Sequence, residues 1–159
     1  MIDSANQEAE DSVEIRLYAE SIEQGEVLGR RVEAAFPWAT VAIVRMPSSG
    51  TKAYKLLKRS NRSMAGIFNL ANPDFILSLV NSTGEHAFGN CEISDAVKTE
   101  DHEMQRYPQV LSAMAYDLVH LKISPHVKAS LAAHGGNVNF DPLTVPRILR
   151  DECGFRGAF

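Results

Sequence analysis

The stretch that decides the fold covers residues 72–94 and reads NPDFILSLVNSTGEHAFGNCEIS. Its first apolar run, at 75–80 (FILSLV), has the β-branched and aromatic composition of a buried strand. Residues 81–84 (NSTG) have the composition of a turn, and 86–94 alternates like a strand that returns beside the first. The stretch therefore predicts a β-hairpin, antiparallel and central to the domain.

Before the hairpin, the pattern predicts a helix, a strand and a second helix. Apolar residues recur at mostly helical spacing through 13–36, which indicates one long helix or two short ones interrupted near Gly25 and Gly29. Residues 39–46 (ATVAIVRM) are β-branched and nearly all apolar, as expected of a buried strand. Thr51 can then cap a helix that runs to about Ser60.

After the hairpin, an amphipathic pattern over 100–120 predicts a long helix, in which Pro108 causes either a kink or a late start. Residues 121–124 are expected to form a further strand and 126–134 a helix. A last short helix is expected over 145–153, with Pro146 near its beginning. This order of elements predicts an α/β domain with a mixed central β-sheet flanked by helices.

The composition is that of an ordinary globular domain. The 159 residues are 45% hydrophobic and 23% charged, enough to build one core without disulfides or a structural metal. Residues 1–12 are acidic with almost nothing apolar to bury, which predicts a flexible tail before a single domain over 13–159. Because the chain has no run long enough to span a membrane and no signal peptide, we expect an intracellular, cytoplasmic protein.

Two carboxylates flank the predicted hairpin. Asp74 stands where the first strand begins and Glu92 lies on the second, so strand pairing can bring both acids to one point. Their oxygens suit Mg²⁺ or Mn²⁺, and the two acids would repel one another unless a cation neutralised them. The spacing therefore predicts a divalent metal site. The alternative is that Asp74 only serves the turn after Pro73 and that Glu92 faces solvent.

A basic block precedes the hairpin. The sequence has no acid between residues 41 and 73, and Lys52, Lys55 and Arg59 share one face of the expected helix. Such a surface can neutralise nucleic-acid phosphates without reading the base sequence. The alternative is a solvated helix that faces an acidic protein or the chain's own N-terminal tail. The residues of this basic stripe are Lys52, Lys55, Lys58, Arg59 and Arg62.

Pro73-Asp74, the intervening hairpin and then Glu92-x-Ser94 resemble the motif of the PD-(D/E)xK nuclease superfamily, which includes restriction endonucleases and viral cap-snatching endonuclease domains. The run GRRVE, which ends at Glu33, is similar to the Gly-x-x-x-Glu of the family's first helix. Gln105-x-Tyr107 lies in the helix where some members carry a Gln and a Tyr. The resemblance covers roughly 29–123 and implies a restriction-endonuclease-like fold.

The resemblance implies a metal-dependent nuclease domain that hydrolyses phosphodiester bonds in DNA or RNA, as part of a larger protein or complex. Asp74 and Glu92 would be catalytic and would bind Mg²⁺ or Mn²⁺ together with the backbone carbonyl of Ile93. Glu33 would complete the metal shell.

One position departs from the family pattern. The Lys that the family usually carries two residues after the Glu is here Ser94. Its role in orienting the attacking water is either taken by Lys98 or lost, in which case the site is degenerate.

Two other functions fit the same residues. One is a non-catalytic α/β interaction domain, whose acids are surface residues and whose basic stripe meets an acidic protein. The other is a degenerate nuclease fold that binds nucleic acid without cutting it.

Overall fold

The computed structural model describes residues 13–60, 62–93, 106–123, 144–154 and 157–158. In this part of the chain, six strands form one mixed sheet with the order β2-β1-β3-β4-β5-β6. The expected tail over 1–12, the expected helix over 126–134 and the first residues of the helix expected over 100–120 lie outside the described residues. None of the described helices is both long and apolar enough to cross a membrane.

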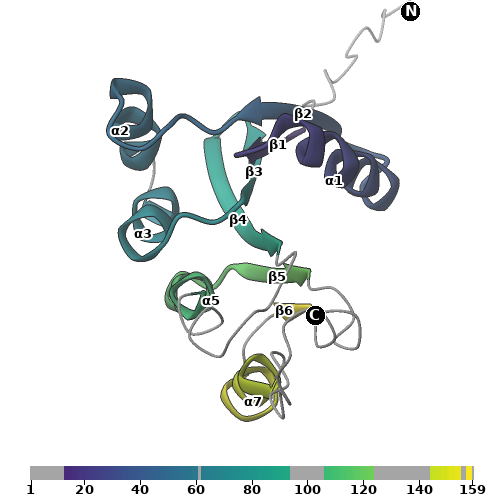
Figure 1. Cartoon of the computed structure of the whole chain (residues 1–159). Coiled ribbons are helices and arrows are strands. Elements are labelled where there is room, and N and C mark those ends of the chain that lie inside the picture. Colours follow the sequence, from purple (N-terminus) through teal and green to yellow (C-terminus); the bar gives the residue numbers. More distant parts are fainter. Residues whose placement is uncertain (1–12, 61, 94–105, 124–143, 155–156, 159) are drawn as a thin grey trace, which may run out of the picture.

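Helices alternate with the strands along the chain, apart from the hairpin itself and the two successive helices before it (Figure 1). Only β3 runs antiparallel to its neighbours within the described sheet, and the other paired strands are parallel. The predicted α/β class, with a mixed sheet flanked by helices, is confirmed at this level. The elements are β1 (Glu14–Ala19), α1 (Ile22–Ala35), β2 (Thr40–Arg45), α2 (Lys52–Arg59), α3 (Arg62–Leu70), β3 (Phe75–Asn81), β4 (Gly84–Ile93), α5 (Tyr107–Ala115), β5 (Val119–Ile123), α7 (Thr144–Cys153) and β6 (Gly157–Ala158).

The predicted hairpin is present as β3 and β4. The pairing is antiparallel and runs from Phe75 opposite Cys91 to Asn81 opposite Gly84, with a register shift of one residue between Leu77 and Ser78. At the turn, the backbone N–H and the hydroxyl of Thr83 donate to Asn81 Oδ1 at 2.9 and 2.6 Å. Gly84 has φ +127°, a conformation that favours glycine. The turn residues therefore reverse the chain by their own local chemistry.

The interpretation of 13–36 as helix throughout is wrong. Glu14–Ala19 forms β1, which lies between β2 and β3. Residues 14–19 alternate as a strand does, with Ile15, Leu17 and Ala19 buried on one face, and the helical interpretation missed this pattern. The helix begins only at Ile22, after Ser21, whose side chain accepts a hydrogen bond from the N–H of Gln24.

Helix α1 is continuous through Gly25 and Gly29, so the expected alternative of two short helices interrupted near these glycines is wrong. Both are buried, and they bring the helix close to the sheet. A Cβ atom placed on Gly25 would lie 2.9 Å from that of Ala19, and one on Gly29 would lie 3.0 Å from Ile43 Cδ1. The glycines therefore set how closely α1 packs on β1 and β2.

The remaining elements largely follow the sequence. The strand expected over 39–46 is β2, and the side chain of Thr51 caps α2 by accepting from the N–H of Tyr54 at 3.1 Å. Pro108 lies in the first turn of α5, so the helix starts late rather than kinking. It ends at Ala115, because the chain then enters β5, which begins two residues before the strand expected over 121–124. Helix α3 was not predicted.

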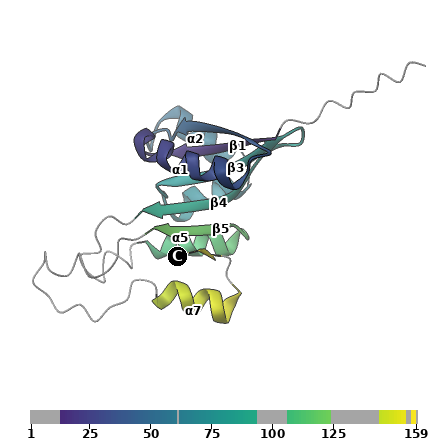
Figure 2. The same cartoon turned by 90° about the vertical axis from the view of Figure 1, so that its right-hand side faces the viewer.

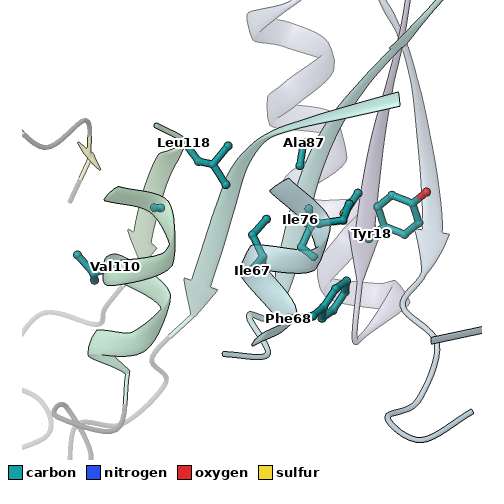
Figure 3. Packing of buried hydrophobic residues seen from close by; sticks show 9 residues of the cluster. Tyr18, Ile67, Phe68, Ile76, Ala87, Val110 and Leu118 are labelled. Atoms are coloured by element: carbon teal, nitrogen blue, oxygen red, sulfur yellow. The ribbon is translucent and has the colours of Figure 1, made fainter. Parts of the chain in front are cut away.

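The helices divide between the two faces of the sheet (Figures 1 and 2). On one face, called here the α1 face, Val32 of α1 packs with Leu17, Phe75 and Cys91. On the opposite face, called the α5 face, α3 and α5 pack against Tyr18, Ile76, Ala87 and Leu118 (Figure 3). Helix α2 joins this second group through Tyr54, whose ring lies edge-on to that of Phe68 at 4.9 Å between centroids.

Gly66 provides a test of how α3 packs beside the end of α5. A Cβ atom on Gly66 would lie 2.0 Å from Tyr116 Cε2, so the ring has to move if the residue is enlarged. We expect Gly66→Ala to lower the free energy of unfolding by about 1–3 kcal/mol in urea denaturation. In a chain that also carries Tyr116→Ala the cost should largely disappear, and an equal cost in both backgrounds would contradict this packing.

Candidate functional site

The register of the hairpin brings the two predicted acids together. Phe75 pairs with Cys91, so the next residues along the two strands, Asp74 and Glu92, lie opposite one another. Asp74 Oδ2 accepts a hydrogen bond from the N–H of Ile93 at 2.7 Å. Burial, and after it the negative charge of Asp74, raises the pKa of the Glu92 carboxyl from 4.5 to about 7. The charge of Asp74 therefore lies near enough to Glu92 to act on its carboxyl group.

Helix α5 supplies the groups that hold the Glu92 carboxylate. Glu92 is only 8% exposed. Arg106, at the N-terminal end of α5, donates from Nε to Glu92 Oε1 at 3.0 Å, and Gln109 donates from Nε2 to Oε2 at 3.3 Å. The positive charge of Arg106 opposes the rise in the pKa of Glu92. These two partners fix the direction of a carboxylate that would otherwise be costly to bury.

A buried lysine on β5 stands beside Glu92. Lys122 is the register partner of Glu92 in the parallel β4–β5 pair, and paired residues on neighbouring strands point to the same face of a sheet. It is 5% exposed, which is rare for a lysine. Asp74 directly before β3, Glu92 on β4 and Lys122 on β5 thus form a row across the sheet.

Lys122 was not predicted as a site residue, although its sequence position carries a signal. It lies between Leu121 and Ile123, and a single cation within an apolar run is unusual for a strand with one buried face. Its partner could not be named from that signal, because the pairing of β5 with β4 joins segments about thirty residues apart.

A second set of buried polar groups lies behind this row and attaches α5 to the sheet. Asn90 donates from Nδ2 to the backbone carbonyl of Gln109 at 3.0 Å and to Ser112 Oγ at 3.2 Å. His120 Nδ1 lies 2.7 Å from Asn90 Oδ1, so this nitrogen carries the proton and donates. Burial, and then the charge of Lys122, lowers the pKa of His120 to about 4, which keeps the ring neutral. These hydrogen bonds hold Gln109, and with it α5, in place above Glu92.

The other residues predicted for the site are distributed differently. Ile93 lies at the pair and contacts Asp74 through its backbone N–H. Glu33 is exposed on α1, which packs on the opposite face of the sheet, so the structure does not bring it to Asp74 and Glu92. Its expected place in a metal shell is corrected for this reason. Lys98, Ser94 and Gln105 lie outside the described residues.

The donor atoms of the pair fit a hard divalent cation. Mg²⁺ usually binds one or two protein carboxylates and keeps several waters and substrate oxygens. Within the described ranges no three His, Cys, Asp or Glu side chains gather at one point, so these residues contribute two carboxylates and not a complete cage. Gln109 Oε1 is buried beside Glu92 and has no hydrogen-bond partner among the described residues. A water held by a cation would supply the missing donor.

The basic stripe lies on the same side of the sheet as the carboxylates. Its members on α2 point away from the core: Lys52, Lys55 and Arg59 are exposed, and Lys58 is half-buried. Arg62 is exposed at the start of α3. The Tyr54 hydroxyl donates to Asn72 Oδ1 at 2.7 Å, which ties α2 to the segment just before Asp74.

The buried cysteine beside Glu92 has no part in the site. Cys91 points to the α1 face, away from the two acids. Burial raises the pKa of its thiol to about 12, which leaves it unreactive.

Comparison of the chain with protein-family models, with curated proteins and with solved structures found no match. What can be inferred about the function therefore comes from the residues and their arrangement.

The raised pKa of Glu92 predicts how stability depends on pH without metal. The folded state binds this proton more tightly than the unfolded state, so stability is lost as the pH rises from 4.5 to about 7. The lowered pKa of His120 has the opposite effect on stability. Below pH 6.5 the unfolded state takes up a proton that the folded state binds less tightly, so this residue makes stability rise with pH from about 4 to 6.5. Comparing the wild type with Glu92→Gln separates the two effects.

We expect Glu92→Gln to gain stability relative to the wild type as the pH rises through this range, because the variant has no charge to bury. Urea unfolding in EDTA across the pH series measures the difference. A difference that stays constant with pH would contradict the raised pKa of Glu92.

Proposed function

We propose that the chain is a metal-dependent nuclease domain of the PD-(D/E)xK type that hydrolyses phosphodiester bonds in nucleic acid. The observation that carries the proposal is the approach of half-buried Asp74 to buried Glu92 at the end of the hairpin, with a buried lysine as the register partner of Glu92. Placing one acid beside another that is buried is unfavourable unless a cation joins them, so their approach needs a functional reason. The mixed sheet with helices on both faces agrees with the fold that the resemblance implies.

Each residue of the row has a role in this proposal. Asp74 and Glu92 would hold Mg²⁺ or Mn²⁺, and the backbone N–H of Ile93 keeps Asp74 directed toward the pair. The ion, when bound, supplies a water of lowered pKa and neutralises charge on the phosphate. Lys122, the register partner of Glu92 on the neighbouring strand, is a buried cation that would hold the attacking water or the developing negative charge. Lys122 is thus a candidate for orienting the attacking water, the role first expected of Lys98.

The position of the basic stripe supports a nucleic-acid substrate. A phosphate backbone bound along α2 would pass Tyr54 and Asn72, which are joined by a hydrogen bond, before it reached Asp74. The chain carries no acidic side chain between residues 41 and 73, so this segment has no charge that repels phosphate. Electrostatic binding of this kind holds DNA or RNA without sequence preference.

A second candidate is a degenerate nuclease fold that binds nucleic acid without cutting it. The ion pair between Arg106 and Glu92 favours it, because a guanidinium already compensates one of the two acids. The two candidates differ in whether a metal can displace Arg106 from Glu92, and this can be measured directly.

Thermal melting with Mn²⁺ tests the metal site. A ligand that binds only the folded state stabilises it by about 2.7 kcal/mol at a hundred times its Kd, so we expect millimolar Mn²⁺ to raise Tm by several degrees. Asp74→Ala should abolish this rise. Glu33→Ala, on the opposite face, is the matched control and should keep it. An unchanged wild-type Tm would favour a fold that does not use metal.

Cleavage of labelled oligonucleotides tests the roles within the row. We expect Asp74→Ala and Glu92→Ala to abolish Mn²⁺-dependent hydrolysis, and Lys122→Met to slow it by roughly a hundredfold or more, because the variant has no buried cation aimed at developing charge. Circular dichroism checks that each variant is folded. Cleavage that survives both acid substitutions would refute the assignment. A metal-induced rise in Tm without cleavage would identify the degenerate fold.

Salt dependence tests the basic stripe. We expect Lys55→Glu with Arg59→Glu to weaken nucleic-acid binding and to flatten the slope of log K against log salt, by about 0.7–0.9 for each phosphate that is no longer neutralised. The matched control is Arg30→Glu with Arg31→Glu, two exposed positions on α1. Fluorescence anisotropy in EDTA measures binding without cleavage. If both double variants weakened nucleic-acid binding equally, the net charge of the protein alone would explain the loss, and the basic stripe would have no specific role.

A further inference from the structure

A polar cavity lies beside the segment just before Asp74 and has been given no role so far. Its volume is about 280 Å³. It reaches from α2 to the start of β3, and Pro73, the residue directly before Asp74, forms part of its wall. The side chains that give it its chemistry are Glu20, Arg45, Ser48, Tyr54 and Asn72.

Backbone hydrogen bonds hold the walls of the cavity together. The N–H of Glu20 donates to the carbonyl of Asp74 at 3.0 Å, which joins the end of β1 to the carboxylate pair. The N–H of Met46 donates to the carbonyl of Ala19 at 2.7 Å and joins the end of β2 to β1. The cavity is therefore built by the ends of three strands and by α2, and it has a fixed position relative to Asp74.

The lining matches a planar ligand that has both donors and acceptors on its edge. Arg45 offers hydrogen-bond donors and a positive charge, whereas Glu20 only accepts, so the cavity is not suited to a simple anion. Tyr54 and Met46 add aromatic and apolar surface on which a flat ring can stack. A nucleobase that carries its phosphate toward Arg45 combines these properties.

The cavity also lies on the path between the basic stripe and the carboxylates. Ser48 and Ser49 belong to its wall, and α2 begins three residues later with Lys52, the first cation of the stripe. A strand bound along α2 therefore reaches the cavity immediately before it reaches Asp74.

We propose that this cavity binds one unpaired nucleotide of the substrate, adjacent to the phosphodiester that Asp74 and Glu92 face. The inference rests on the proposed function and names its substrate class: single-stranded nucleic acid or an unpaired end, and not a fully paired duplex. A base within a duplex has its edge occupied by its partner and its faces by its neighbours, so it could enter the cavity only after unstacking.

Binding in EDTA tests the inference without any cleavage. The probes are a fluorescein-labelled dodecanucleotide of thymidine and a blunt duplex of the same length, measured by fluorescence anisotropy. We expect the single strand to bind more tightly, and Arg45→Ala and Glu20→Gln each to weaken it by roughly tenfold with little change for the duplex, because each variant recognises one base less well. Arg30→Ala, exposed on α1, is the control.

A base-free position placed along the single strand gives a second measurement that does not depend on the variants. One such position should lower the affinity of the wild type and have no effect on Arg45→Ala. Equal affinity for both probes, or an equal weakening on single strand and duplex, would overturn the cavity proposal. If metal-dependent cleavage persists in that case, the nuclease proposal stands. Conversely, loss of the Mn²⁺ response with an intact single-strand preference would overturn the nuclease proposal alone.

Discussion

The register of the β3–β4 hairpin is the constraint on which the candidate site depends. Successive side chains on a strand point to opposite faces, so a slip of one residue would turn Glu92 to the α1 face and away from α5. Burial on both faces prevents such a slip, because Phe75 and Cys91 pack on one side while Ile76 packs on the other. The turn at 81–84 starts the pairing at a fixed residue, and a shift of one residue between Leu77 and Ser78 then sets the register that reaches the acids. The same packing that stabilises the sheet therefore places the two acids opposite one another.

The site contains charged groups that the fold has to compensate. Glu92 is buried near Asp74, which raises its pKa, and among the described residues Arg106 and Gln109 offset the cost of its charge by hydrogen bonds. Structural cores rarely accept such an arrangement, whereas sites that bind metals or substrates use it. The neutral network around Asn90 and His120 has a different function, since it holds α5 against the sheet without adding charge.

The two faces of the sheet have separate tasks. On the α1 face the packing is apolar, and the glycines of α1 allow close contact with β1 and β2. The carboxylate row, the polar cavity and α2 with its basic stripe follow one another along one end of the sheet, and the helices beside the row and the stripe pack on the α5 face. Glu33 lies on the first of these faces, which explains why a residue that fits a family pattern along the chain does not reach the acids in space.

Elements with local signals could be predicted from the order of residues alone. The hairpin, the cap at Thr51, the late start of α5 at Pro108 and the approach of Asp74 to Glu92 all depend on residues close together along the chain. Residues 14–19 carry the alternation of a strand, but so short a run did not stand out from the helical spacing that follows it, and its central place in the sheet became clear only from the folded chain. The same holds for the groups around Glu92, which come from α5 and β5. Their contacts arise from the pairing of β5 with β4 and the packing of α5 above them, and no short-range pattern of side chains encodes which distant segments will pair.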